Sequence, residues 1–166
     1  PNINLESVPR VLDMMMKWPN ACYGMMGLHP CYVKEDWEKE LESIMARLDS
    51  PHEGFDFVAV GEIGLDLYWD KKFKTEQSQA FLTQVGMAKE RGLPIVIDVR
   101  DAWNELFTLM DQVNDDSLRG VFHCFTGGLQ EATRALDYGG FLLGIGGVST
   151  YKNGGLDKVL PSIPLE

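Results

Sequence analysis

Four polar side chains follow apolar runs of the kind that form buried strands. GL precedes His29, FVAVG precedes Glu62, PIVI precedes Asp98 and RGVF precedes His123. In parallel α/β folds, the carboxyl ends of the strands open into an active-site crevice or the mouth of a barrel. Two histidines and two carboxylates that converge there suit divalent metal ions, which polarise a phosphoryl or carbonyl oxygen and lower the pKa of a bound water. The spacing therefore predicts a site for metal-assisted hydrolysis.

Each of these residues also has a purely structural interpretation. Glu62 could cap a loop or pair with Arg100, and Asp98 could cap the next helix or form the same pair. His29 could be a turn histidine, and His123 could be a hydrogen-bonded core residue. We favour metal binding or catalysis for Glu62, because a carboxylate that closes an apolar run needs a strong partner. His123 likewise comes directly after an apolar run, and this position at a strand end favours a role as a metal ligand.

The segment after Glu62 adds two residues with open roles. Asp66 could orient the 62–66 loop, and we favour a role in which it supports the residues that line the site. Trp69 could belong to the core or could stack against a base.

An alternation of helices and strands must position these side chains. Helices are expected at 7–18, 34–48, 74–91, 101–113, 129–138 and near 155–160, and strands at 21–28, 57–61, 94–97, 119–122 and 141–145. Ser7 and Asp101 are candidate helix caps. The strands are continuous apolar runs, which indicates parallel strands covered on both faces and joined by crossover helices. The sequence predicts an α/β fold and one domain over residues 1–166.

Composition sets limits on the class of protein. The 166 residues include 25 acids and 15 Lys and Arg, for a net charge of −10, with 45% hydrophobic and 24% charged residues. This is typical of a globular domain, and no apolar run suits a membrane span. The acidity argues against nucleic-acid binding by bulk charge but permits an enzyme that reaches phosphates through metal ions. Three unpatterned cysteines (Cys22, Cys31 and Cys124) are expected to be buried thiols in a reducing cytoplasm.

With these residues in place, the chain resembles the TatD family of metal-dependent deoxyribonucleases. The matching segments are GLHP at 27–30, VAVGEIGLDLYWD at 58–70, LPIVIDVRDA at 93–102, GVFHCFTGG at 120–128 and FLLGIGGVSTYKN at 141–153. The resemblance implies a TIM-type (β/α)8 barrel and hydrolysis of DNA or another phosphodiester, often from the 3′ end, with a divalent cation as cofactor. It implies no membrane partner.

The resemblance assigns roles to individual residues. Glu62 matches the family's bridging carboxylate, which is both a metal ligand and a catalytic group, and His123 matches the histidine of its HCF motif, a metal ligand here. His29 matches a histidine that lines the site. Arg100 matches an arginine suited to contact a phosphate, although it could instead pair with Asp101 or Glu62.

The sequence departs from the family pattern in three places. Asp98 stands where the family has a metal-binding histidine; this change is expected to favour Mg²⁺ or Mn²⁺ over Zn²⁺, or to mark a weakened site. The chain does not contain the family's early H-x-H pair, since its histidines before Glu62 are His29 and His52. It also does not contain the late aspartate of an E-T-D segment.

A complete barrel of this type needs about 250 residues. The expected strands correspond to barrel strands three to seven, with residues 1–3 as a possible end of strand two. We therefore expect the chain to be part of a longer polypeptide that has little or no activity alone, or else a short protein that completes its sheet by association. Two other functions stay open: a metal hydrolase of the same superfamily acting on a small ester or amide, and a non-catalytic relative. The oligomeric state is not predicted.

Overall fold

The computed structural model describes residues 1–49 and 56–164 of the chain, so that His52 lies outside the described residues. Helices and strands alternate along the chain, as the apolar pattern predicts. In chain order they are the short 3-10 helix η1 (Leu5–Ser7), α1 (Val8–Lys17), β1 (Met25–Met26), η2 (Pro30–Tyr32), α2 (Trp37–Leu48), β2 (Ala59–Asp66), α3 (Lys74–Glu90), β3 (Ile95–Arg100), α4 (Trp103–Val113), β4 (Gly120–Phe122), α5 (Leu129–Asp137), β5 (Phe141–Leu143), η3 (Gly147–Thr150), α6 (Leu156–Val159) and η4 (Leu160–Ser162).

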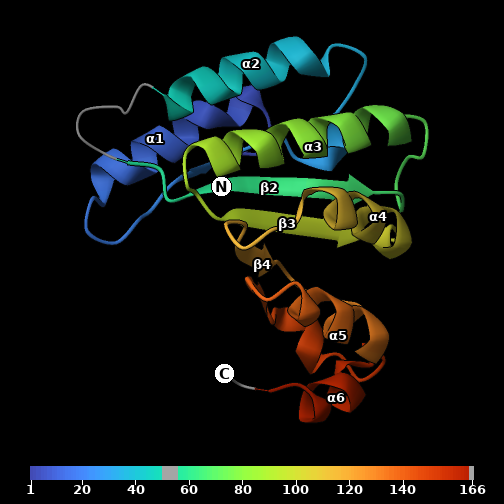
Figure 1. The fold of residues 1–166 in the computed structure, drawn as a ribbon. Helices are drawn as coiled ribbons and strands as arrows, with labels where there is room; N and C mark the ends of the chain where they lie inside the picture. Colours follow the sequence, from blue (N-terminus) through green and yellow to red (C-terminus); the bar gives the residue numbers. More distant parts are fainter. Residues whose placement is uncertain (50–55, 165–166) are drawn as a thin grey trace.

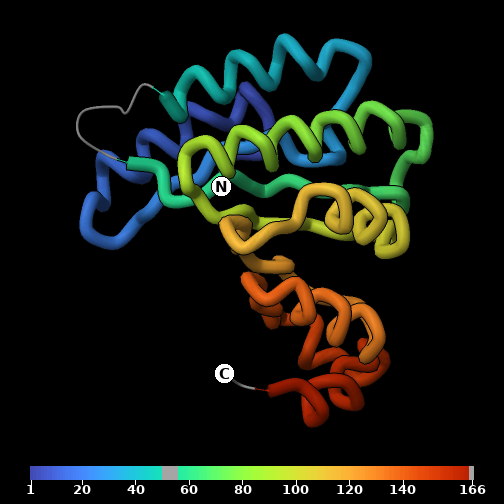
Figure 2. The backbone as a smooth tube through the Cα atoms, in the orientation of Figure 1, coloured from blue at the N-terminus to red at the C-terminus, as the bar shows by residue number. Residues whose placement is uncertain are grey.

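The five strands form one parallel sheet whose spatial order, β1-β2-β3-β4-β5, equals their order in the chain. A doubly wound sheet would reverse this order at a switch point, whereas a barrel adds each strand on the same side of the last. The ribbon and the backbone tube both advance in one sense, from α1 and α2 at one end to α5 and α6 at the other (Figures 1 and 2). The fold is thus α/β with the arrangement of an incomplete (β/α)8 barrel.

The register of the strands shows which face of the sheet the helices cover. Phe122 of β4 pairs with Ile97 of β3, and its ring lies 5.9 Å and 6.5 Å, between centroids, from Trp103 and Phe107 of α4. Paired residues of parallel strands point to the same face, and successive residues point to opposite faces. Ile97 therefore packs under the helices, whereas Asp98 faces the other side of the sheet.

The central strands are longer than the sequence predicts, and this corrects the positions of two candidate residues. Glu62 and Asp98 lie within β2 and β3 rather than beyond their ends. Pairing of the two strands continues to the partners Asp66 and Arg100. Gly64 permits this close approach, because a Cβ there would lie 2.0 Å from the Asp98 carbonyl oxygen, and its φ of +146° disfavours other residues. By contrast, β1 spans two residues instead of the expected 21–28.

Neither of the two predicted residues caps its helix through its side chain, although Ser7 does take the N-cap position of α1. The Ser7 hydroxyl accepts hydrogen bonds from the amides of Ile3 and Asn4, which precede it, instead of capping α1. Asp101 has a left-handed backbone (φ +51°), so Ala102 takes the position before α4 and no side chain caps that helix. Trp103, the first residue of α4, packs against the rings of Phe107, Phe122 and Phe125.

The N-terminal residues lie against β1 without forming the expected end of a strand. The buried Asn2 side chain donates to the Gly27 carbonyl oxygen at 2.8 Å, and the Gly27 amide donates back to the Asn2 Oδ1 at 2.9 Å. One amide side chain thus satisfies both backbone groups of Gly27, as a neighbouring strand would.

The expectation of buried thiols is also wrong. Cys22 and Cys31 are half-buried, and Cys124 is exposed. None of the described helices combines the length and apolar character that crossing a membrane requires.

Candidate functional site

The four side chains singled out by their spacing meet on the face of the sheet that the helices leave open. His29 Nε2 lies 3.2 Å from Asp98 Oδ2 and 3.9 Å from Glu62 Oε2, while His123 Nδ1 lies 3.2 Å from Glu62 Oε1. His29, Asp98 and Glu62 are largely buried, and the side chain of His123 is 44% exposed. Bases and acids therefore alternate in the order His123, Glu62, His29 and Asp98.

Local irregularities of the backbone determine the directions in which the Glu62 and His123 side chains point. The β2–β3 register pairs Gly61 with Val96 and Ile63 with Ile97, which leaves Glu62 as an extra residue in a bulge. Bulges of this kind redirect a side chain and are common beside active sites. His123 directly follows β4, as predicted, and the next residue, Cys124, has a left-handed backbone (φ +46°) that turns the chain away from the sheet.

A backbone hydrogen bond fixes the orientation of the His29 ring. Its Nδ1 accepts the amide hydrogen of Cys31 at 3.1 Å, so this nitrogen carries no proton. The neutral ring must then carry its proton on Nε2, the nitrogen that faces Asp98 and Glu62. In this arrangement the proton of His29 Nε2, and not a lone pair, faces the two carboxylates.

Asp98 is a buried carboxylate between two bases. Its Oδ2 lies 3.0 Å from Arg100 Nε as well as 3.2 Å from His29 Nε2. Burial alone would raise the pKa of Asp98, but the contact with His29 and the charge of Arg100 outweigh it and hold this pKa below its usual value. Neither contact has the alignment of a hydrogen bond, so Asp98 Oδ2 is a buried oxygen without a hydrogen-bond partner.

Arg100 does not form the ion pairs that the sequence allowed with Asp101 or Glu62. Besides Asp98 it approaches Asp66, whose Oδ2 lies 3.6 Å from its Nη1. Asp66 Oδ2 also accepts a hydrogen bond from the Cys31 thiol at 3.1 Å. Burial, this bond and the Asp66 charge raise the pKa of Cys31 to about 12, which keeps the thiol protonated and unsuited to bind metal.

Two buried glutamines of α3 support the site, and the sequence reasoning missed them. Gln84 accepts from the Leu28 amide at 2.7 Å and donates to the Leu28 carbonyl oxygen at 3.3 Å, next to His29. Gln77 makes the same paired contacts with Asp66, at 2.9 and 3.1 Å. The available signal was their spacing of seven residues, which puts both on the helix face that also carries the buried Phe81 and Val85.

The chemical types of the donor atoms at this site are those that bind divalent cations. Carboxylate oxygens and imidazole nitrogens are common ligands of Mg²⁺, Mn²⁺ and Zn²⁺, and the unpartnered Asp98 oxygen is a group that a cation would satisfy. The 3.2 Å between Glu62 Oε1 and His123 Nδ1 is also compatible with two ligands of one ion. Across residues 1–49 and 56–164, however, no three His, Cys, Asp or Glu side chains are arranged to hold a metal ion.

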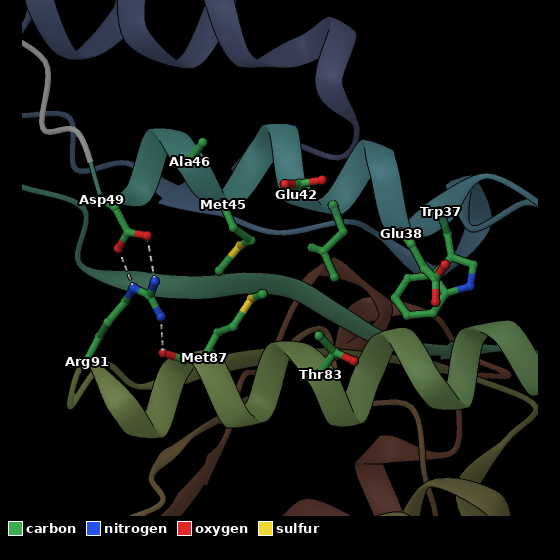
Figure 3. Close-up of a pocket in the computed structure, with 10 residues that line it drawn as sticks. Trp37, Glu38, Glu42, Met45, Ala46, Asp49, Thr83, Met87 and Arg91 are labelled. Carbon is green, nitrogen blue, oxygen red and sulfur yellow. Dashed lines mark hydrogen bonds and ion pairs between the residues drawn. The ribbon is translucent and has the colours of Figure 1, made fainter.

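A groove between α2 and α3 lies on the outer, helical side of the sheet and holds none of the candidate residues. It has a volume of about 420 Å³, and its walls include Trp37, Met45 and Met87. Figure 3 shows how Arg91 closes one end by donating two hydrogen bonds to the Asp49 carboxylate, both of 2.7 Å. This ion pair joins the ends of two helices and is a structural contact.

Comparison with known proteins identifies a family and several relatives of this chain. A model of the family described as "TatD related DNase" matches residues 1–166. An uncharacterized metal-dependent hydrolase of Bacillus subtilis, YabD, is 35% identical over 95% of this chain, and the 3′-5′ ssDNA/RNA exonuclease TatD of Salmonella typhimurium is 32% identical over 98%. The chain spans 60% and 61% of the lengths of these two relatives.

A solved structure extends the likeness to three dimensions. The crystal structure of YjjV, a TatD homologue of Escherichia coli, superposes with a TM-score of 0.88 at 30% identity. The superposition covers 99% of this chain and 62% of that protein.

Proposed function

Since this chain belongs to the TatD related DNase family, we propose that the protein containing it is a metal-dependent phosphodiester hydrolase that acts on nucleic acid. Two relatives support the proposal by name, one as a metal-dependent hydrolase and one as an exonuclease of single-stranded DNA and RNA. The observation that carries it is the position of Glu62, whose two oxygens lie within 3.9 and 3.2 Å of His29 and His123.

In this proposal Glu62, Asp98 and His123 contribute ligands to a divalent cation. Two of the three donors are carboxylates, which favours Mg²⁺ or Mn²⁺ over Zn²⁺. When bound, such a cation supplies a water of lowered pKa and neutralises charge that develops on the phosphodiester.

The remaining residues bind and orient. Arg100 is half-exposed and lies at the rim, so its guanidinium is placed to move from Asp98 and Asp66 to a substrate phosphate, which it can hold by two hydrogen bonds. His29 keeps its Nε2 proton toward Asp98 and Glu62 and so maintains the spacing of the two carboxylates.

The direct test measures hydrolysis of a labelled single-stranded oligonucleotide by the intact protein with added Mn²⁺ or Mg²⁺. Glu62→Gln keeps the size of the side chain and removes its charge, and we expect activity to fall at least about 100-fold. Glu90→Gln, at an exposed position at the end of α3, is the matched control and should retain activity. Unchanged hydrolysis by Glu62→Gln would overturn the assignment.

Two further measurements separate the alternatives. A small aryl ester offered under the same conditions identifies an esterase or amidase of the superfamily if it is hydrolysed while the oligonucleotide is not. Metal analysis of the intact protein identifies a non-catalytic relative if no Mn²⁺, Mg²⁺ or Zn²⁺ is retained and neither substrate is cleaved. In an active protein, Asp98→His should raise the activity obtained with Zn²⁺ relative to Mg²⁺.

A further inference from the structure

We propose that Tyr68 and Trp69 form a stacking platform for the bases of a single-stranded nucleic acid that enters the site. This inference rests on the proposed function and deepens it by naming the part of the substrate that the platform binds. The two rings are 62% and 71% exposed, although aromatic side chains of this size are normally buried. They follow β2 directly, beyond Asp66.

The platform has a defined geometry. The two ring centroids lie 4.9 Å apart and the ring planes are nearly perpendicular, at 88°. The Asp66 Oδ1 accepts the backbone amide hydrogens of both Tyr68 and Trp69, at 3.0 and 3.1 Å. Because Asp66 itself is only 1% exposed, the aromatic pair is attached to the rigid core and not to a free loop. A pre-ordered surface loses little conformational entropy when it binds a base.

The two rings border separate recesses, and each recess contains a cation. Tyr68 lines one of about 450 Å³ together with Arg100, and Trp69 lines one of about 270 Å³ together with Lys34. Each recess also has two carboxylates in its wall, Asp101 and Glu131 in the first and Asp66 and Asp70 in the second. A base on each ring would therefore have a cation nearby for a backbone phosphate. Aromatic faces combined with a basic track are the usual means by which proteins bind single strands without reading sequence.

Positive charge gathers beside Trp69 in a chain whose net charge is −10. The segment 71–74 reads KKFK, and the Phe73 ring has the Lys34 and Lys72 ammonium groups 5.0 and 4.4 Å from its centroid. Lys72 pairs with Glu35 at 2.8 Å and Lys74 with Glu105 at 2.9 Å, so only part of this charge is available to phosphates. The base stacking must then supply most of the affinity, and salt dependence should be modest.

Asp66 also connects the platform to the candidate site. Its Oδ1 holds the two aromatic residues, while its Oδ2 lies 3.6 Å from Arg100, which in turn contacts Asp98. A base stacked on Tyr68 would thus place its phosphate beside Arg100 and next to the proposed metal ligands. Contacts of this kind select unpaired ends over duplex, because a paired base cannot present its face.

The test measures binding of a fluorescein-labelled 15-nucleotide oligo-dT to the intact protein in EDTA, where no hydrolysis competes. An abasic oligonucleotide of equal length and charge is the second probe. The variants are Trp69→Ala, Trp69→Phe and, as the matched control, Trp18→Ala. Trp18 is also an exposed tryptophan (52%), but it follows α1 in the segment that leads into the start of β1, whereas Trp69 comes after the carboxyl end of β2.

We expect Trp69→Ala to weaken oligo-dT binding roughly 5- to 150-fold, and Trp69→Phe and Trp18→Ala to bind within about 3-fold of the parent. The abasic oligonucleotide should bind the parent no more tightly than oligo-dT binds Trp69→Ala, because it cannot stack on either ring. Equal binding of both probes to the parent, or an unchanged dissociation constant for Trp69→Ala, would overturn the platform. A shift of Trp69→Ala from dimer to monomer with unchanged oligonucleotide binding would overturn it in favour of a protein interface.

These outcomes are independent of the proposed function. A parent that shows no metal-dependent hydrolysis but binds oligo-dT through Trp69 contradicts the hydrolase and supports the platform. A parent that hydrolyses oligonucleotides with the same KM in Trp69→Ala supports the hydrolase and contradicts the platform.

Discussion

His123 Nδ1 lies 3.2 Å from Glu62 Oε1, although Glu62 belongs to β2 and His123 directly follows β4, and β3 separates these two strands in the sheet. Neighbouring strands are about 4.8 Å apart, so next-nearest strands in a flat sheet are roughly twice as far from each other. Side chains on the open face must therefore lean over Asp98 on β3 to meet. The contact shows that this face is concave, as the inside of a barrel wall is.

Removal of the Asp98 carboxylate should destabilise the protein. Asp98→Ala removes the carboxylate that faces the buried His29 Nε2–H and one of the two carboxylates near Arg100. We expect a loss of about 1–2 kcal/mol in the free energy of unfolding, measured in urea. Asp13→Ala, at an exposed position on α1, should change it by less than about 0.5 kcal/mol. Equal effects of the two substitutions would contradict the buried contacts.

The buried glutamines give a second stability prediction. Gln84→Met keeps the volume of the side chain but leaves the Leu28 amide and carbonyl without partners inside the core. The expected cost is about 2–4 kcal/mol, together with faster hydrogen exchange of the Leu28 amide. Gln79→Met, on the exposed side of the same helix, is the control and should be nearly neutral. A protected Leu28 amide in Gln84→Met would show that another group replaces the glutamine.

The cysteines should differ in reactivity. The Cys31 thiol is held protonated by its raised pKa of about 12, whereas Cys124 is exposed. Treatment of the native protein with iodoacetamide at pH 8, followed by peptide mass spectrometry, should label Cys124 first and Cys31 only after unfolding. Asp66→Asn removes the charge that opposes the Cys31 thiolate and should speed its labelling. Labelling of Cys31 at the rate of Cys124 in the native parent would argue against the Asp66 contact.

Stability should fall at high pH partly through Tyr138. Burial and the 2.6 Å hydrogen bond that its hydroxyl donates to Asp111 raise the pKa of Tyr138 to about 12. The folded protein then holds this proton more tightly than the unfolded chain, in which the pKa is about 10. The resulting stabilisation is complete below pH 10 and is lost as the pH rises toward 12. Thermal unfolding between pH 9 and 12 should show a steeper decline for the parent than for Tyr138→Phe, and parallel declines would refute this assignment.

Much of the fold could be predicted from sequence because continuous apolar runs of strand length are typical of strands buried on both faces. The alternation of such runs with amphipathic stretches is sufficient to indicate a parallel sheet with crossover helices. Strand ends were less predictable. The pairing of β2 with β3 extends through Glu62 and Asp98 because Gly64 allows close approach of the backbones, and a single sequence does not show which glycine has that role.

The site was predictable as a set of residues but not as a set of contacts. The phase of His29, Glu62, Asp98 and His123 after apolar runs is visible in the sequence, and the structure brings all four together. The pair of Arg100 with Asp98 was among the contacts that the sequence allowed, whereas its approach to Asp66 depends on the register between strands, which is a tertiary property. The roles of the α3 glutamines depend on the same property, since each is defined by a backbone group distant in sequence.

Gln77 and Gln84 attach the end of β2 and the segment after β1 to a single helix, two helical turns apart. The helix therefore fixes the distance between the His29 side and the Asp66 side of the site. Thermal motion of α3 would carry both segments in the same direction, which leaves the interval between them unchanged. An inserted residue between the two glutamines would rotate one of them by about 100° away from the sheet and would release one segment while the other stayed attached.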